Sequence, residues 1–520
     1  MSQPGSSKRV AIVGAGPGGL VAGRYLAAHG FEPVLFEQSG DMGGQWNAQG
    51  AHSGIWPSMR ANSTREMTCF SDLRYEPGVS LYPRNQDVLA YLHRYAEKFD
   101  LIRRVRLRTS IERIERASEG GCYRVSSKPE GGALQQELFD YVLIASGRFH
   151  KPSLPAIPGL ESFTGSGGVA HSFQYKKPER YRDLRVLVCG CNISALEIAS
   201  DLAMMGTQRV LSAMRRQRYI LQKITGGVPN EHIAFTRWGA LAAEVFPLEQ
   251  VVAGIKEFIL RTSGSPEQYG AFKPADNLFE AGVTLSQSYL PLIAEGRITQ
   301  KPWPTEVRGQ RVFFQDGTSE EVDAIILGTG YDLNLSFLSD ELRQTLSVDR
   351  QHIDLHHFTF HPDLEGLAFM GLFLVGGPFF PLLELQARWI AYAWANVRPM
   401  PSKAEMREGV ARYQARRGQP QEQVMEAMAL MFSRLLGVEP DVEKDPRLTR
   451  ALLFGPLSPV SFRLTGPDAL PDAAELYAAD AAVCGASTSP RLTDEERMRF
   501  EAVKRALVAR AETERSSTGS

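Results

Sequence analysis

A glycine-rich stretch near the N-terminus, V-A-I-V-G-A-G-P-G-G at residues 10–19, limits the possible folds of this chain most strongly. An apolar run typical of a β-strand leads into it, and a helical pattern follows over residues 18–29. In such a strand–turn–helix unit, one glycine makes the turn, one admits a pyrophosphate and one lets the helix pack on the strand. Gly14, Gly16 and Gly19 hold these positions. The stretch therefore predicts a dinucleotide-binding turn.

An acidic residue supports this interpretation. A second strand pattern, residues 33–36, ends in Glu37, where a Rossmann-type fold places the acceptor for a ribose hydroxyl. Because the turn lies close to the N-terminus, we expect this half of the nucleotide site to hold the adenosine of FAD. The residues expected to contact it are Gly14, Ala15, Gly16, Pro17, Gly18, Gly19 and Glu37.

A second strand–turn–helix unit begins at residues 185–190, R-V-L-V-C-G. Asn192 stands where glycine is usual, and because asparagine tolerates a left-handed backbone we expect the turn to persist. The next strand, residues 209–213, is followed by arginines instead of an acid, which suits the 2′-phosphate of NADPH; a solvated basic turn is the alternative. The expected NADPH contacts are Gly190, Ser194, Ala195, Glu197, Arg215 and Arg216.

Bulk properties exclude several classes of partner. A chain of 520 residues should form two or three domains, and a net charge of −1 gives no general attraction to nucleic acid or an anionic membrane. Five irregularly spaced cysteines and the lack of a signal-peptide pattern favour reduced thiols and a cytoplasmic location. Residues 366–383 carry no charge, but glycines and prolines interrupt them, so we expect a buried strand and a turn, with no membrane association.

Several linked motifs resemble the flavin-containing monooxygenases. They are E-x(5)-G-G-x-W from Glu37, N-S-T-R-E-M-T-C-F-S-D at residues 62–72, and G-T-G-Y at residues 328–331. The resemblance covers about residues 8–467 and implies an α/β protein with two Rossmann-like dinucleotide-binding domains. The FAD-binding domain would comprise residues 1–175 and 329–400, with an NADPH-binding domain, residues 176–328, inserted in it. Residues 401–520 would form a mostly helical C-terminal region with a charged tail.

The same resemblance assigns roles near the flavin. It implies that Asn62 is the catalytic hydrogen-bond donor beside the reactive face of the flavin, although an asparagine considered alone is more often a turn or cap residue. It also places the N-terminus of a helix over residues 381–396 near the flavin's pyrimidine edge; a simple packing helix is the alternative. The further cofactor contacts that it implies are Gly44, Gln45, Trp46, Asn62, Ser63 and Gln386.

The reaction implied by the resemblance uses FAD, NADPH and O2. A C4a-(hydro)peroxyflavin would transfer one oxygen atom to an amine nitrogen or a sulfur of a small molecule. Tyr175, in the fingerprint-like segment of residues 163–176, stands where many Baeyer–Villiger oxygenases have tryptophan, which favours nitrogen or sulfur oxidation. Oxygenation of a ketone is the alternative, followed by an NADPH oxidase that releases peroxide. A flavin disulfide reductase is disfavoured because Cys189 and Cys191 lie at the NADPH turn.

Other patterns carry less functional information. His352, His356, His357 and His361 are close in sequence, but their apolar neighbours favour a partly buried segment, and we expect no metal site. Two helices are predicted over residues 402–417 and 421–436. A third, amphipathic helix over residues 493–515 would pack on the body of the chain or on a second subunit, the latter forming a homodimer.

Overall fold

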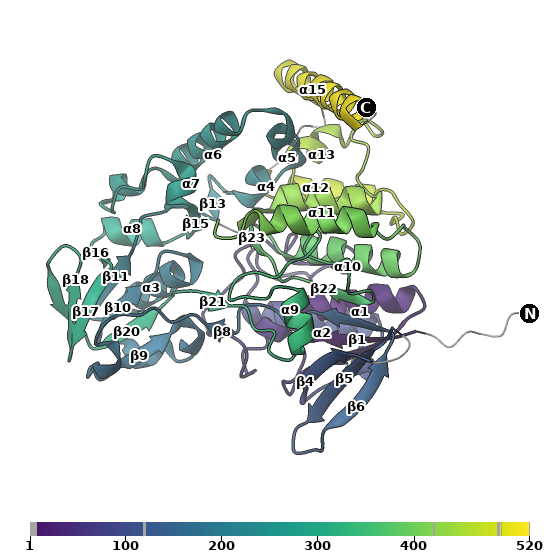
Figure 1. Cartoon of the computed structure of the whole chain (residues 1–520). Coiled ribbons are helices and arrows are strands. Elements are labelled where there is room, and N and C mark those ends of the chain that lie inside the picture. Colours follow the sequence, from purple (N-terminus) through teal and green to yellow (C-terminus); the bar gives the residue numbers. More distant parts are fainter. Residues whose placement is uncertain (1–7, 118–120, 420–421, 486–488, 490, 519–520) are drawn as a thin grey trace, which may run out of the picture. The chain divides into compact units, whose positions relative to one another are not determined.

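The structure is a computed structural model that describes residues 8–117, 121–419, 422–485, 489 and 491–518 (Figure 1). The chain forms two compact units, each assembled from three separate segments. Unit 1 comprises Met1–Pro155, His171–Pro178 and Thr329–Val424, and unit 2 comprises Ala156–Ala170, Glu179–Gly328 and Met425–Ser520.

Unit 1 is built on a parallel five-stranded sheet with the order β22-β7-β1-β2-β3. The strands of a parallel sheet are buried on both faces, which explains the uninterrupted apolar run of β1. The predicted first strand and helix are confirmed to within one residue. The sheet strands and the helix after β1 are β1 (Arg9–Val13), β2 (Glu32–Phe36), β3 (Val105–Arg106), β7 (Tyr141–Ile144), β22 (Leu367–Phe369) and α1 (Pro17–Ala28).

Helix α10 (Phe380–Trp394) closes unit 1 and packs against α1 (Figure 1). Every residue of α10 is buried, so the lack of charge in its first residues, 380–383, reflects their place in the protein core. The prediction for residues 366–383 is confirmed, because β22 is a buried strand and an irregular stretch with β23 (Leu374–Gly376) leads into the helix. Across the described part of the chain, no helix combines the length and apolar character needed to span a bilayer.

The other elements of unit 1 surround this sheet. A separate antiparallel sheet has the order β4-β5-β6, and β24 adds a parallel partner to β23. The elements are α2 (Asn85–Lys98), β4 (Thr109–Arg116), β5 (Tyr123–Pro129), β6 (Gln135–Phe139), β8 (Lys151–Pro152), β21 (Tyr331–Asp332), α9 (Asp340–Thr345), α11 (Lys403–Gln414) and β24 (Glu422–Val424).

Unit 2 contains a second five-stranded sheet, in the order β16-β11-β10-β20-β9. Its central strand β10 runs parallel to both neighbours, and the helix that follows, α3, ends at Gly206, whose φ of +84° suits glycine. The elements of this sheet and its helix are β9 (Gly168–His171), β10 (Arg185–Cys189), α3 (Ile193–Met205), β11 (Arg209–Met214), β16 (Ile298–Pro302) and β20 (Ala324–Leu327).

Short strands and several helices complete unit 2. Three of the strands form an antiparallel sheet in the order β17-β18-β19. The elements are β12 (Tyr219–Leu221), β13 (Ile224–Thr225), β14 (Val228–Pro229), α4 (Glu231–Ala234), α5 (Arg237–Val245), α6 (Leu248–Ser263), α7 (Leu278–Ala281), β15 (Val283–Leu285), α8 (Tyr289–Ala294), β17 (Pro304–Arg308), β18 (Arg311–Phe314), β19 (Ser319–Glu321), α12 (Met425–Leu436), α13 (Thr449–Phe454), α14 (Ala473–Ala482) and α15 (Asp494–Thr518).

The C-terminal third is divided between the two units after Val424. Helix α11 confirms the prediction for residues 402–417, including the reciprocal cap between Ser402 and Glu405. The predicted start of the next helix, at residue 421, lies outside the described residues. Its continuation was wrong as far as residue 424, because residues 422–424 pair with β23 and the helix begins only at Met425.

The predicted amphipathic helix is α15, and it packs on its own unit. Thr493 and Glu496 cap its start, and the side chains of Phe500 and Val503 are buried. Arg450 forms an ion pair of 3.1 Å with Glu496. Packing on the body of the chain is therefore the alternative that the structure supports.

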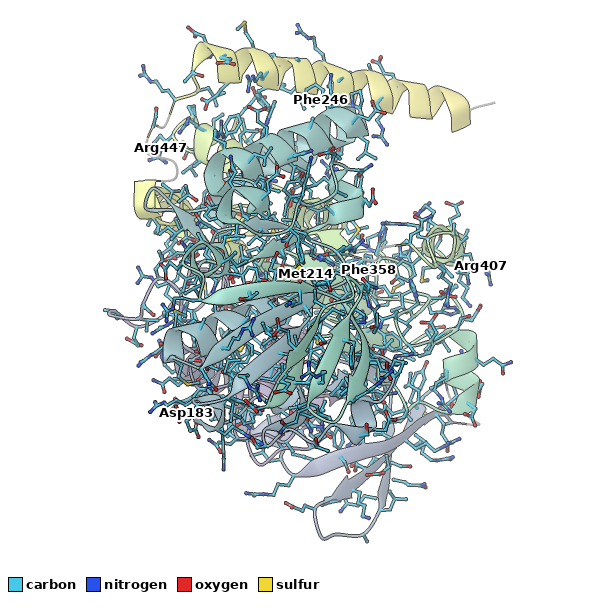
Figure 2. The ribbon with its side chains drawn as sticks, turned by 90° about the vertical axis from the view of Figure 1, so that its left-hand side faces the viewer. Asp183, Met214, Phe246, Phe358, Arg407 and Arg447 are labelled. Atoms are coloured by element: carbon cyan, nitrogen blue, oxygen red, sulfur yellow. The ribbon has the colours of Figure 1, made fainter. Side chains whose placement is uncertain are left out.

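The predicted histidine segment is mostly buried and contains a left-handed turn. Phe358 (Figure 2) has a φ angle of +59°, a left-handed conformation that is uncommon for a bulky residue, and the φ angle of the preceding His357 is +46°. Burial lowers the pKa of the His356 and His357 imidazoles to about 4. Among the residues that the structure describes, no three His, Cys, Asp or Glu side chains are grouped in a way that could hold a metal ion.

These imidazoles should make unit 1 sensitive to acid. Because the pKa of His356 is about 4 when folded and near 6.5 when unfolded, its contribution to stability is complete above pH 6.5 and is lost as the pH falls toward 4. The loss should be about 1.4 kcal/mol per pH unit over that window. We predict a shallower fall in Tm between pH 6.5 and pH 5 for His356→Asn than for the unaltered chain. Equal slopes for the two proteins would contradict the prediction.

Candidate functional site

The first nucleotide turn has space only for glycine at two positions. Gly14 has a φ of +102°, and a Cβ atom there would lie 2.7 Å from the backbone oxygen of Ala145. A Cβ atom on Gly19 would lie 1.9 Å from the backbone oxygen of Gly14. Helix α1 begins at Pro17, and no side chain caps its N-terminus. Its first backbone N–H groups are therefore available to an anion such as a pyrophosphate.

Glu37 lies at the carboxyl end of β2, beside this turn. One carboxylate oxygen accepts a hydrogen bond of 3.0 Å from the backbone N–H of Ala15, and the other accepts one of 2.9 Å from Ser39 N–H. The Glu37 side chain is thus fixed against the turn. A carboxylate accepts about four hydrogen bonds, so acceptor sites remain for ribose hydroxyls.

A second glycine turn lies against the first. Gly43 N–H donates to the backbone oxygen of Ala15 at 2.9 Å, and a Cβ atom on Gly44 would lie 2.9 Å from the Cα atom of Gly16. Two backbone segments thus approach without intervening side chains, and they form a cradle that an elongated phosphate ester fits. Trp46 ends this turn and is partly exposed.

The Gln45 side chain makes hydrogen bonds that hold the same turn in place. Its Nε2 donates to the backbone oxygens of His52 and Phe149, at 2.8 and 3.0 Å, and its Oε1 accepts from Gly54 N–H at 2.9 Å. The side chain therefore ties the turn to two other loops. Its predicted cofactor contact would have to come from the backbone.

Asn62 lies on a rigid segment but keeps a free side chain. The nearby residues Cys69 and Phe70 are buried, and the hydroxyl of Ser63 is paired with that of Thr68 at 2.8 Å. The Asn62 amide is partly exposed and has no hydrogen-bond partner among the residues described. A hydrogen-bond donor that is fixed in position and not used within the protein can stabilise a reactant bound beside it.

The second nucleotide turn follows β10. Gly190 has a φ of +135°, and a Cβ atom there would lie 2.4 Å from the backbone oxygen of Gly328. The expected turn is present, and Asn192 has an extended conformation with a φ of −114°, so no left-handed backbone is needed at this position. Its side-chain oxygen instead accepts from Ile193 N–H at 3.0 Å and from the Thr284 hydroxyl at 3.2 Å. Asn192 thus caps α3, which removes the need for glycine.

Both predicted arginines are exposed directly after β11, whose last residue is Met214 (Figure 2). The Arg215 guanidinium lies 4.5 Å from the centre of the Trp303 ring, and Arg216 donates to the backbone oxygen of Glu280 at 2.8 Å. Within the described residues neither forms an ion pair with a carboxylate. Two uncompensated cations at this position suit a phosphate.

The other predicted contacts near this turn differ in availability. Ala195 is buried and packs close to Gly328, whereas Ser194 is partly exposed at the start of α3. Glu197 accepts from the Ser286 hydroxyl at 2.9 Å and from Lys223 at 3.4 Å. Burial raises the pKa of the Cys189 thiol to about 12, so this cysteine stays protonated and unreactive.

Comparison with known proteins identifies the family. The sequence model of the flavin-binding monooxygenase-like proteins matches residues 7–484. The chain belongs to this family. It is thus a flavoprotein monooxygenase that uses FAD and NADPH, and the predicted fold class of two Rossmann-like domains is confirmed.

Relatives of this monooxygenase cover most of its length. Dimethylaniline monooxygenase [N-oxide-forming] 2 of Rattus norvegicus is 32% identical over 485 residues, which cover 88% of this chain and 89% of the relative. Among solved structures, S-allyl-L-cysteine S-oxygenase from Allium sativum is 26% identical, with a TM-score of 0.61 and coverage of 83% and 89%. A cyclohexanone monooxygenase shares the fold at 16% identity, with a TM-score of 0.63 and coverage of 83% and 98%.

One predicted flavin contact of this monooxygenase is engaged in the core. The Gln386 side chain is fully buried, and its Nε2 lies within 3.2 Å of the backbone oxygens of Phe358 and Phe369 and of the Thr359 hydroxyl. Its Oε1 accepts from Gly371 N–H at 2.9 Å. Both amide hydrogens are therefore used within the protein, and Gln386 holds the turn that contains Phe358 and Thr359. Its contact with the flavin stays a prediction.

Sequence reasoning missed Glu384 of this monooxygenase. Its buried carboxylate accepts from the Tyr25 hydroxyl at 2.7 Å and from the backbone N–H of Ser71 at 2.8 Å. It thereby joins α10 to α1 and to the segment that carries Asn62. The available signal was an acid in a largely apolar helical stretch whose one other charged residue is Arg388, which usually means a buried, paired carboxylate.

Proposed function

We propose that this monooxygenase transfers one oxygen atom of O2 to an amine nitrogen or a sulfur atom of a small molecule. The observation that carries the proposal is the identity of 32%, over nearly the whole length, to an enzyme named as N-oxide-forming. The similar plant structure is named as an S-oxygenase. Amine and thioether lone pairs attack an electrophilic oxygen without a base, so the reaction requires no general base from the chain.

Each unit is proposed to hold one cofactor. In unit 1, the helix N-terminus at Pro17 and the carboxylate of Glu37 would bind the pyrophosphate and the adenosine ribose of FAD. In unit 2, the turn at Gly190 and the guanidinium groups of Arg215 and Arg216 would bind NADPH. When bound, the flavin supplies the redox chemistry and the activation of O2.

Asn62 is proposed as the group that stabilises oxygen transfer. Its amide can donate a hydrogen bond to negative charge that develops on oxygen, in a place where the surrounding segment is already fixed. Trp46 and the buried aromatic side chains of the same unit would limit the access of water. Tyr175, buried against Trp56 with ring centres 5.8 Å apart, keeps the fingerprint-like segment in place.

A substrate panel tests the proposed reaction. The purified holoenzyme is supplied with NADPH, O2 and, in turn, a tertiary amine, a thioether and a cyclic ketone. We expect one N-oxide or sulfoxide for each NADPH consumed and no lactone. A lactone as the only oxygenated product would establish the ketone alternative, and stoichiometric hydrogen peroxide with every substrate would establish an NADPH oxidase.

Removal of the two arginines should weaken NADPH binding selectively. A charge-assisted hydrogen bond contributes about 1.5–3 kcal/mol, so the loss of even one such bond in Arg215→Ala/Arg216→Ala should raise the KM for NADPH at least about 10-fold and leave that for NADH nearly unchanged. Bleaching of FAD under argon at varied coenzyme concentrations measures both. Arg209→Ala, at the opposite end of β11 and paired with Glu320 at 2.9 Å, is the control. A parallel loss with both coenzymes would contradict the proposed phosphate contact.

The cytoplasmic location and the homodimer stay predictions. The structure describes a single chain, and α15 packs on unit 2. Light scattering of the purified protein would give its oligomeric state directly.

A further inference from the structure

Arg148 is a buried cation at the edge of the unit 1 sheet. It follows β7 by four residues, and only 4% of it is exposed. Its guanidinium donates to the backbone oxygen of Leu372 at 2.8 Å and, at 3.4 Å, to the backbone and side-chain oxygens of Gln351. Both of these partners are neutral. The Nε group of Arg148 has no partner in the described part of the chain.

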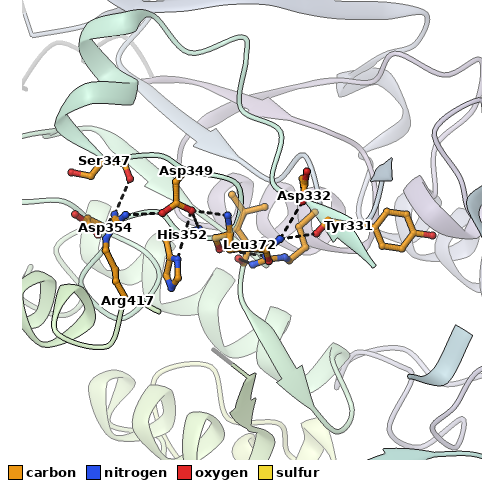
Figure 3. A network of polar contacts seen from close by, with 10 residues as sticks. Tyr331, Asp332, Ser347, Asp349, His352, Asp354, Leu372 and Arg417 are labelled. Atoms are coloured by element: carbon orange, nitrogen blue, oxygen red, sulfur yellow. Dashed lines mark hydrogen bonds and ion pairs between the residues drawn. The ribbon is translucent and has the colours of Figure 1, made fainter. Parts of the chain in front are cut away.

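The acids of this neighbourhood are bonded to other arginines, and Figure 3 shows Asp349 and Asp354 beside Arg417. Asp332 pairs with Arg350 at 2.9 Å, and Asp349 and Asp354 pair with Arg417 at 2.8 and 2.6 Å. Arg148 reaches Asp332 only indirectly, because the Gln351 amide lies between them and donates to Asp332 at 3.3 Å.

A buried charge without a counter-charge is costly for a folded protein. Arginine cannot relieve that cost by losing its proton, since its pKa is too high. Neutral oxygens satisfy some of the N–H donors of Arg148, but no carboxylate among the described residues compensates its positive charge. The arrangement is therefore suited to a bound group that carries negative charge.

The sheet order indicates which part of FAD meets this cation. The adenosine side is set by Glu37 at the end of β2, and the pyrophosphate by the turn after β1. In the order β22-β7-β1-β2-β3, the remaining half of the dinucleotide must then extend toward β7 and β22. Arg148 follows β7, and its partner Leu372 follows β22. The guanidinium thus lies on the side of the isoalloxazine ring and away from the adenosine.

We propose that Arg148 stabilises the negative charge of reduced flavin and so makes the bound FAD easier to reduce. The proposal rests on the FAD site proposed for unit 1. Transfer of a hydride from NADPH moves two electrons and one proton to the ring, and the nicotinamide leaves as NADP⁺. Without uptake of a second proton the ring gains one negative charge. A fixed buried cation on that side favours the charged form, because the local dielectric is low.

Equilibration of the holoenzyme with a redox dye of known potential under argon tests this inference. For Arg148→Gln, the ratio of reduced to oxidised FAD at a fixed dye potential should fall at least about tenfold, a shift of about 30 mV for a two-electron couple. Arg148→Lys keeps the charge and should stay within about threefold of the unaltered enzyme. Arg343→Gln removes an arginine of α9 in the same unit, paired with the exposed Asp340 outside this network, and it should leave the ratio unchanged.

The outcomes separate this inference from the proposed FAD site. Arg148→Gln protein that retains FAD with an unchanged ratio would overturn it, as would an equal loss in Arg148→Lys. Weaker FAD binding with an unchanged ratio would assign Arg148 to the pyrophosphate instead. If Arg148→Gln does not retain FAD, Arg148→His is used in its place. Its ratio of reduced to oxidised FAD should fall further below that of the unaltered enzyme from about pH 6 to about pH 8, because the imidazole becomes neutral. A constant deficit would overturn the inference, whereas an unaltered enzyme that binds no FAD would refute the proposed function itself.

Discussion

Gly19→Ala should bind FAD about 10- to 100-fold more weakly than the unaltered chain, because the new methyl group has no space. Its Cβ atom would lie 1.9 Å from the backbone oxygen of Gly14, and that contact can be relieved only by movement of the turn or of α1. Overpacking of this kind costs about 1–3 kcal/mol, and 1.4 kcal/mol is a factor of ten in affinity. Since the turn is also the proposed pyrophosphate cradle, the cost should appear in cofactor binding.

Titration of the FAD-free protein with FAD, followed by flavin fluorescence, measures this effect. Gly23→Ala is the matched control on the same helix, where the new Cβ atom would meet the flexible end of Leu35 at 3.3 Å. It should keep its FAD affinity within about twofold, because a side-chain end can move more easily than a backbone oxygen. Equal affinities for the two variants would show that close packing of helix on strand does not shape the cofactor site.

Asn62→Ala should lower product formation about 100-fold while the reduction of FAD by NADPH continues at its usual rate. The loss of one preorganised donor costs about 10²–10³ in rate when that donor faces developing negative charge. Because the Asn62 amide has no partner among the described residues, its removal should cost little stability. NADPH would still be consumed, and the reducing equivalents should appear as hydrogen peroxide.

Two companion variants refine this test. Asn62→Asp keeps the shape but cannot donate when ionised, so it should be as defective as the alanine variant. Gln49→Ala removes an exposed amide nearby in the sequence and should retain full coupling. Coupling is measured as product and peroxide formed for each NADPH oxidised. Full coupling of NADPH oxidation to product formation in Asn62→Ala would show that Asn62 has no role in oxygen transfer.

The sequence predicted the features of the fold that depend on local backbone geometry. The two nucleotide turns, the acid at the end of β2 and the cap of α11 each follow from neighbours in the chain, so their patterns can be recognised directly. The start of α12 was misplaced because residues 422–424 pair with β23, which is more than forty positions away in the sequence. A tertiary strand partner overrode the helical pattern there.

The hydrogen-bond partners of polar side chains could not be predicted in the same way. Gln45 and Gln386 stood in stretches associated with the cofactor, but their amides are engaged by Phe149 and Phe358, which are distant in the sequence. The lack of a carboxylate partner for Arg148 among the described residues is also a property of the folded unit, because Asp332, Asp349 and Asp354 are distant from it in the sequence and pair with other arginines. Only the folded structure distinguishes a polar group whose hydrogen bonds are already made within the protein from one that can bind a ligand.

The position of β22 has a consequence for synthesis of the protein. This strand completes the five-stranded sheet of unit 1 by pairing with β7, although Leu367 follows Val142 by more than two hundred residues. During synthesis, β7 therefore leaves the ribosome long before β22, and the edge of β7 stays unpaired while the second sheet is made. A chain that stalls in this interval presents an unpaired apolar strand to its neighbours. Chaperone protection at that stage should therefore determine the yield of active enzyme more than the stability of the finished fold does.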